Sequence, residues 1–153
     1  ADLHRRSEVC RAVNERYLEA LTAAPADLTL GELLTPLCKP VRRRGRRQRG
    51  LRPLAPEDLR LLKVISQGDC LLEGFRNRDV RALLFPAPTS TKTLLARQSS
   101  ATTRRLAFLR AHGLIRKIRS SHRYQITSKG RRATNALFTA CSIPVDQLER
   151  IAA

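Results

Sequence analysis

A short hairpin pattern between two helical patterns restricts the fold of this chain more than any other feature of its sequence. Residues 114–118 (Leu-Ile-Arg-Lys-Ile) and 123–127 (Arg-Tyr-Gln-Ile-Thr) are rich in β-branched and aromatic residues, and the Arg-Ser-Ser-His segment between them is polar. Such a pair of runs predicts two antiparallel strands joined by a hydrophilic turn. Gly113 is expected to end the helix before this hairpin, and Thr127 or Ser128 to cap the helix after it.

The rest of the chain is dominated by helical spacing of aliphatic residues. The sequence has no Trp, four Phe and two Tyr, so the core must be mainly aliphatic. Amphipathic patterns, caps and breakers predict helices at about 2–23, 29–37, 56–67, 77–85, 99–112, 128–140 and 143–151. In the helix at 99–112, Ser99 or Ser100 is the expected cap, and Thr102, Leu106 and Leu109 are expected to face inward. Residues 91–98 are expected to form either an extra helical turn or a lead-in to this helix. The predicted fold class is therefore mainly α with a small β-hairpin, that is, α+β.

Three local features complete this prediction. Leu54 is expected to pack on Leu59 as a hydrophobic staple at the start of its helix. Asn77 is expected to cap the following helix, and Thr29 to form a capping box with Glu32. Counting 100° per residue, the outward face of the helix at 99–112 and the residues just before it carries Arg97, Ser100, Arg104 and Phe108.

The predicted elements divide the chain into four segments. These are an N-terminal helical arm (1–38), an Arg-rich linker or hairpin (39–53), a helix-and-hairpin domain (54–141) and a C-terminal tail helix (142–153). An apolar stripe at helical spacing runs along the arm through Cys10, Val13, Tyr17 and Ala20. It is expected either to fold back on the domain or to pack on a second copy, which would make a homodimer.

The charge distribution indicates a polyanionic partner. The net charge is +17, and the interval between Asp79 and Asp146 contains thirteen Arg or Lys but no acidic residue. A merely solvated surface mixes both signs, so a one-sided stretch of this length favours binding to a nucleic acid.

The Arg-rich segment 39–53 contains seven arginines and two glycines. It predicts either an exposed hairpin that turns at Gly45 or a solvated basic linker. The run Arg44-Gly45-Arg46 is similar to the Arg-Gly-Arg core of AT-hooks, which bind the minor groove, although the proline expected after it is missing. In both alternatives the segment would contact phosphates through Arg42, Arg43, Arg44, Arg46, Arg47 and Arg49.

The order helix, short helix, capped helix, basic hairpin, helix resembles the winged helix-turn-helix domains of bacterial regulators of the MarR, PadR and ArsR types. The resemblance rests on Arg-Arg-Leu-Ala-Phe-Leu-Arg-Ala-His-Gly-Leu-Ile-Arg-Lys (104–117) and on Tyr-Gln-Ile-Thr-Ser-Lys-Gly-Arg (124–131). The first is similar to a recognition helix running into a wing strand, and the second to a wing strand followed by a Thr-x-x-Gly helix start. With the flanking helices the resemblance covers residues 54–141. A long Pro-rich segment before the third helix departs from the tight turn usual in the family.

The resemblance implies that the helix around residues 100–112 enters the major groove and that the hairpin is a wing lying on phosphates or in the minor groove. The recognition-helix residues would be Arg97, Ser100, Thr103, Arg104 and Arg105. The wing residues would be Arg116, Lys117, Arg119, His122 and Arg123.

The sequence also argues against other classes of function. The four cysteines are widely spaced and the three histidines add no ligand spacing, so no metal site or cofactor is expected. The core region offers no paired carboxylates, and the sequence has no phosphate-binding glycine loop or nucleophile elbow, which predicts a protein that is not an enzyme. No apolar run approaches the length of a membrane span, and the N-terminus lacks a secretory signal, so a cytoplasmic location is expected.

These observations together predict sequence-dependent binding of double-stranded DNA, by a regulator or by the DNA-binding part of a larger bacterial protein. Two alternatives remain open. One is a nucleic-acid-binding domain excised from a mobile-element or nucleic-acid-processing enzyme, and the other is an RNA-binding winged helix, because an acid-free stretch attracts either nucleic acid.

Overall fold

The computed structural model describes residues 28–68, 70, 74–87 and 91–152. The predicted helix at 2–23 and its apolar stripe lie outside these residues. The elements are α2 (Leu30–Cys38), β1 (Val41–Arg43), β2 (Arg46–Gln48), α3 (Pro56–Ile65), α5 (Asn77–Leu84), α6 (Lys92–Ala111), β3 (Ile115–Lys117), β4 (Tyr124–Ile126), α7 (Ser128–Ser142) and α8 (Val145–Ala152). The predicted α+β class, mainly helical with a small hairpin at 115–126, is confirmed.

A second antiparallel hairpin is formed by the Arg-rich segment. Strands β1 and β2 pair with Val41 opposite Gln48 and Arg43 opposite Arg46, which leaves Arg44 and Gly45 as a two-residue turn. Both turn residues have positive φ, 50° for Arg44 and 75° for Gly45. Of the two alternatives drawn from the sequence, the hairpin turning at Gly45 is therefore the one that the chain adopts.

A single aliphatic core joins the described segments. Leu62 and Ile65 of α3, Leu106 of α6 and Leu137 of α7 are buried in it. Leu37 from α2 and Leu51 from the segment after β2 belong to the same core, at 0% and 3% exposure. The division of the chain into segments stays a prediction, but residues 28–53 share their packing with the helices that follow them.

The start of α7 is fixed by a contact that only glycine permits. Thr127 caps the helix, as predicted, by accepting a hydrogen bond from the Gly130 N–H, and its hydroxyl donates to the carbonyl of Gly113 at 2.6 Å. A Cβ at Gly130 would lie 2.2 Å from the carbonyl oxygen of Leu114. The Thr-x-x-Gly sequence thus brings the first turn of α7 against the start of the β3–β4 hairpin.

Helix α6 is longer than the sequence predicted. Its cap is Thr91, whose hydroxyl accepts from the Leu94 N–H, so the predicted cap at Ser99 or Ser100 is wrong. No Gly or Pro interrupts residues 92–111, and Ser99 and Ser100 lie in mid-helix. Helix α6 is therefore one continuous helix of 20 residues, with one side packed on the core.

Asn77 does not cap α5, contrary to prediction. It is the first residue of the helix, and the Asp79 carboxylate accepts from the Arg76 N–H instead. The Asn77 side chain donates to the Ser99 carbonyl at 3.1 Å and to the Thr103 hydroxyl at 2.9 Å. A residue typical of caps is used here to hold α5 against α6.

Two expectations about apolar side chains are also wrong. Leu54 is 73% exposed and forms no staple. Phe108, expected on the outward face of α6, is buried at 6% exposure, because the Arg49 guanidinium lies 4.6 Å from its ring centroid and His112 contacts it edge-on. Arg49, which directly follows β2, thus covers a part of α6 that helical periodicity alone predicts to be exposed.

Candidate nucleic-acid interface

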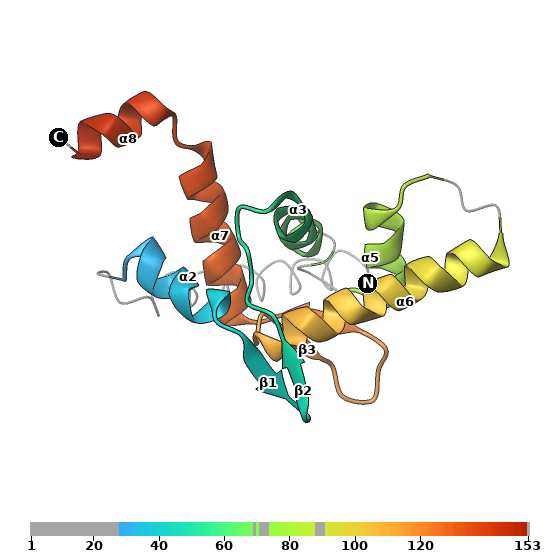
Figure 1. The fold of residues 1–153 in the computed structure, drawn as a ribbon. Coiled ribbons are helices and arrows are strands. Elements are labelled where there is room, and N and C mark those ends of the chain that lie inside the picture. Colours follow the sequence, from blue (N-terminus) through green and yellow to red (C-terminus); the bar gives the residue numbers. More distant parts are fainter. Residues whose placement is uncertain (1–27, 69, 71–73, 88–90, 153) are drawn as a thin grey trace, which may run out of the picture.

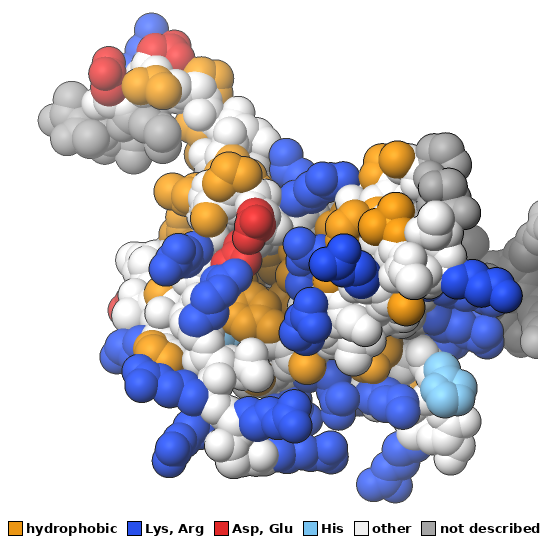
Figure 2. Space-filling model, turned by 45° about the vertical axis from the view of Figure 1, so that its right-hand side comes forward, with side chains coloured by type: hydrophobic (Ala, Val, Ile, Leu, Met, Phe, Trp, Pro, Cys, Tyr) orange, Lys and Arg blue, Asp and Glu red, His pale blue; other side chains and the backbone are white. Residues whose placement is uncertain are grey.

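Both hairpins and α6 lie on one side of the molecule. In Figure 1 the two hairpins project below α6, while α8 lies at the opposite, upper end. Figure 2, turned about the same vertical axis, shows Lys and Arg side chains gathered over this lower part. Acidic side chains are visible higher up, including those on the α8 end. The surface around α6 and the hairpins is therefore the candidate site.

The solvent side of α6 presents most of the residues assigned to groove contacts. Arg97, Ser100, Thr103 and Arg104 are exposed, while Thr102, Leu106 and Leu109 on the opposite side are buried, as predicted. Arg105 differs, because it is half-buried with its guanidinium 5.5 Å from the ring centroid of Phe85. Thr103 is held by Asn77 of α5, so Arg97, Ser100 and Arg104 are the more open members of the set.

A groove of about 590 Å³ separates the β1–β2 hairpin from the C-terminal half of α6. The described residues that line it include five arginines and no acidic side chain. They are Arg43, Arg44 and Arg46 with Gln48 from the hairpin, and Arg104, Ala107, Arg110 and Ala111 from α6. Converging guanidinium groups repel one another, so a bound anion would relieve the repulsion and accept their hydrogen bonds.

The β1–β2 hairpin is attached to the end of α6 by two contacts. The Arg43 side chain donates to the carbonyl of Arg110 in the last turn of α6, which also accepts from the Gly113 N–H at 3.2 Å. The buried His112 ring, with its proton on Nε2, donates to the Arg49 carbonyl at 2.8 Å. These contacts fix the hairpin at one end of the groove.

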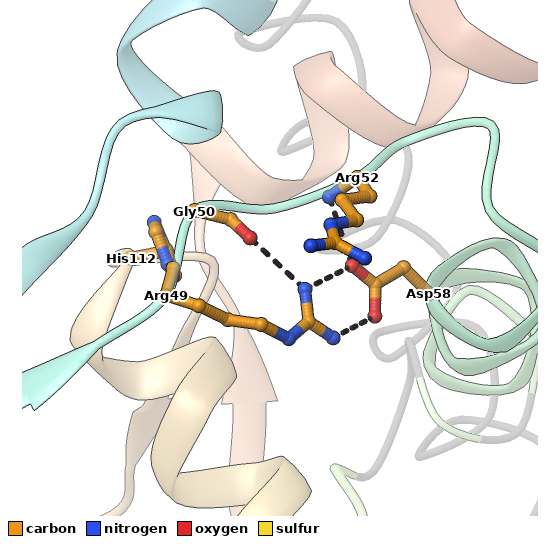
Figure 3. Close-up of polar contacts among 5 residues, drawn as sticks. All are labelled: Arg49, Gly50, Arg52, Asp58 and His112. Atoms are coloured by element: carbon orange, nitrogen blue, oxygen red, sulfur yellow. Dashed lines mark hydrogen bonds and ion pairs between the residues drawn. The ribbon is translucent and has the colours of Figure 1, made fainter.

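Arg49 holds the hairpin to α3 as well. Its guanidinium forms a two-pronged contact with the buried carboxylate of Asp58, with nitrogen–oxygen distances of 2.7 and 2.5 Å, and Asp58 also accepts from the Arg52 N–H at 2.8 Å (Figure 3). Arg49 is therefore held in place by the fold, although its side chain is 48% exposed. The remaining five arginines predicted to contact phosphate, Arg42, Arg43, Arg44, Arg46 and Arg47, are exposed.

The same network sets the charge state of Asp58. Burial alone would raise its pKa, but the hydrogen bonds from Arg49 and Arg52 and the positive charges of these residues outweigh burial and hold the pKa below its ordinary value. Asp58 is therefore ionised at neutral pH, and its negative charge is neutralised by Arg49 rather than presented to the groove.

The β3–β4 hairpin is the other basic projection of this face. Arg116, Lys117, Arg119 and His122 are exposed, as their predicted role requires, and Arg116 donates to the Gln125 side chain at 3.1 Å. Arg123 is half-buried and lies 3.4 Å from the Gly74 carbonyl, so it braces the hairpin from inside.

Arg110 connects the two projections and was missed by the sequence prediction. It lines the groove, and its guanidinium lies 5.9 Å from the ring centroid of Tyr124 in β4. Thr103, Ala107 and Arg110 follow one another at helical spacing, so extending the predicted stripe from Thr103 by one turn and then another would have found it.

Other classes of site were sought among the described residues. No group of three or more His, Cys, Asp or Glu there could hold a metal ion, and Cys38 and Cys141 are exposed free thiols. None of the described helices combines the length and the apolar character that crossing a membrane requires.

Comparison with known proteins gave no match to a family model, to a curated protein sequence or to a solved structure.

Proposed function

We propose that this chain binds double-stranded DNA, with α6 in the major groove and the two basic hairpins on the phosphates at either side. The observation that carries the proposal is the arginine-lined groove between α6 and the β1–β2 hairpin, which combines five guanidinium groups with an exposed helix face. Arg forks match phosphate and guanine in a two-pronged geometry, and the major groove is wide enough to admit an α-helix.

The role that we propose for each basic residue follows from its position in the fold. Arg97, Ser100 and Arg104 project from the open face of α6 and are proposed to contact base edges, with the small side chain of Ala107 allowing close approach. The exposed arginines of both hairpins are proposed to contact phosphates, which position the protein without reading sequence. The order α3, α5, α6, β3–β4 and α7 supports a winged helix-turn-helix with α6 as recognition helix and β3–β4 as wing.

Such an activity suits a transcription regulator or the DNA-binding part of a larger bacterial protein, acting in the cytoplasm where the DNA lies. RNA is the second candidate, because the same groove would attract its backbone. The exposed length of α6 favours DNA, since the major groove of A-form RNA is too deep and narrow for side chains to read.

The test begins with selection of a preferred site from random duplexes, followed by titration of fluorescent duplexes at fixed salt. Arg104→Ala is expected to weaken binding to the preferred site by about 1–3 kcal/mol and to reduce the difference between preferred and random sequences. Arg150→Ala on α8 is the matched control, because it removes the same charge at the far end of the molecule and should leave affinity almost unchanged.

Three outcomes would contradict the proposal in different ways. Equal losses on preferred and random duplexes would make Arg104 a phosphate contact only. Tighter binding to an RNA duplex of the same sequence would replace DNA by RNA as the partner. Equal losses for Arg104→Ala and Arg150→Ala would show that net charge, rather than this face, attracts the nucleic acid.

A further inference from the structure

A second hollow, of about 270 Å³, lies between α3, α6 and the end of β2. Its apolar lining is Leu61 of α3 with Ala101 and Phe108 of α6, and Gln48 of β2 adds a neutral polar side chain. A concave apolar surface with a few placed polar groups is typical of small-molecule sites, which measure roughly 300–1,000 Å³ for drug-sized ligands. The smaller volume of this hollow suits a ligand of lower mass than a typical drug.

Two of the charged residues around this hollow neutralise each other, and two have no ionic partner. Arg49 and Asp58 line it as an ion pair (Figure 3). Arg104 of α6 and Glu57 of α3 also line it and are exposed, and within the described part of the chain neither forms an ion pair. The negative charge of Glu57 would repel a phosphate, so this hollow is not suited to the DNA backbone.

The two unpaired charges have opposite signs and come from different helices. An arginine side chain binds a carboxylate in a two-pronged geometry, and a glutamate accepts hydrogen bonds from an ammonium group. Arg105 is the other cation of the lining, but it is half-buried with its guanidinium 5.5 Å from the ring centroid of Phe85, so Arg104 is the more available. A free α-amino acid carries both a carboxylate and an ammonium group, and an apolar side chain on it would cover the apolar lining.

Arg104 connects this hollow with the proposed DNA contact. Its side chain lines both the hollow and the arginine-lined groove beside the β1–β2 hairpin. A guanidinium that is bound to a ligand carboxylate cannot at the same time donate to a base edge. A ligand in the hollow and a duplex on α6 would therefore exclude each other.

We propose that this hollow binds a free α-amino acid with an apolar side chain, its carboxylate on Arg104 and its ammonium group on Glu57, and that the amino acid competes with DNA for Arg104. The competition rests on the proposed function, whereas the amino-acid site does not. Because coupling between two ligands is reciprocal, the duplex weakens binding of the amino acid by the same factor.

The first experiment titrates L-valine, L-leucine and L-phenylalanine separately into the full chain by isothermal titration calorimetry. At least one of them is expected to bind with a Kd below about 1 mM. Its N-acetyl derivative has no ammonium group, and its amide derivative has no carboxylate. Each derivative is expected to bind at least about tenfold more weakly, because each loses a hydrogen bond between charged groups.

Glu57→Gln is the decisive variant, because it removes the proposed partner of the ammonium group at an exposed position where the fold should be kept. It should weaken binding of the amino acid at least about tenfold. Ala101→Leu, which fills the hollow without changing its charge, should also prevent binding. Glu149→Gln on α8 is the matched control, since it removes the same charge far from the hollow and should leave binding unchanged.

The second experiment measures duplex binding with and without the amino acid. A saturating amount should lower the affinity of the wild-type chain for its preferred duplex at least about fivefold. The same amount should leave the affinity of Glu57→Gln for that duplex unchanged.

The outcomes separate the site from the function on which the competition rests. Absence of binding by all three amino acids would overturn the site, and so would equal binding of the N-acetyl derivative, because the hollow would then take carboxylates alone. Binding of the amino acid that leaves duplex affinity unchanged would overturn the competition. Binding of the amino acid by a chain that binds no duplex would overturn the proposed function and the competition, and would support the site.

Discussion

Replacing Asp58 with asparagine tests how the β1–β2 hairpin is held beside α6. Asp58 is 3% exposed and accepts two hydrogen bonds from Arg49 and one from the Arg52 N–H. Removing one partner of a fully buried ion pair costs about 3–5 kcal/mol. The Arg49 side chain is 48% exposed, however, so water can solvate it after the pair is lost. We expect a loss of about 2 kcal/mol, near the value of one hydrogen bond to a charged group.

The same pair predicts how stability depends on pH. The pKa of Asp58 is lower in the folded chain than its ordinary value, so the folded state favours the ionised form. The stabilisation is therefore fully present above the ordinary pKa of an aspartate, near 4, and is lost as the pH falls from there through the folded pKa. The wild-type chain should lose stability over this acid range by more than Asp58→Asn does.

Thermal unfolding followed by circular dichroism measures both effects. At pH 7 the melting temperature of Asp58→Asn should fall by about 4–8 °C, which corresponds to about 2 kcal/mol for a domain of this size. Glu57→Gln is the control, because it removes a charge from the same first turn of α3 at an exposed position and should cost at most about 1 kcal/mol. Equal losses of stability at pH 7 in the two variants would refute the reasoning. So would an equal fall in stability with decreasing pH in the wild-type chain and in Asp58→Asn.

Two further substitutions test the packing and the second hairpin. Gly130→Ala places a Cβ 2.2 Å from the Leu114 carbonyl oxygen and should cost at least about 1–3 kcal/mol in unfolding experiments. Gly31→Ala, at an exposed position of α2, should be neutral or stabilising. Equal effects of the two substitutions would contradict the close approach at Gly130. Replacing both Arg116 and Arg119 by alanine should lower the slope of log affinity against log salt by up to about two without changing sequence preference. An unchanged slope would mean that the β3–β4 hairpin points away from the nucleic acid.

The sequence was sufficient to predict those strands and helix caps that depend only on residues a few positions apart. The strands at 115–117 and 124–126, the Thr127 cap and the capping box of Thr29 with Glu32 are all confirmed, because each depends on residues a few positions apart. The buried stripe of α6 through Thr102, Leu106 and Leu109 was also predictable, since helical periodicity alone determines it.

The errors arose where contacts between distant segments decide the structure. Phe108 was placed outward because periodicity cannot show that Arg49 comes from another segment to cover it. The sequence groups Arg49 with the arginines predicted to contact phosphate, but Arg49 is paired with Asp58. Asp58 itself is explained by its favourable place in the first turn of a helix, so nothing in the sequence indicates this partner. The prediction that Asn77 caps α5 is wrong because its side chain bonds to Ser99 and Thr103 of α6, and these contacts exist only once the two helices have packed together.

The salt dependence of duplex binding tests the central claim most directly. Affinity of the full chain for one fluorescent duplex would be measured over a series of salt concentrations. Each phosphate contact should contribute about −0.9 to the slope of log affinity against log salt, so roughly six to eight contacts from the two hairpins and α6 predict a slope of about −5 to −7. A slope near zero, or no binding even at low salt, would contradict the assignment of this arginine-rich face to DNA.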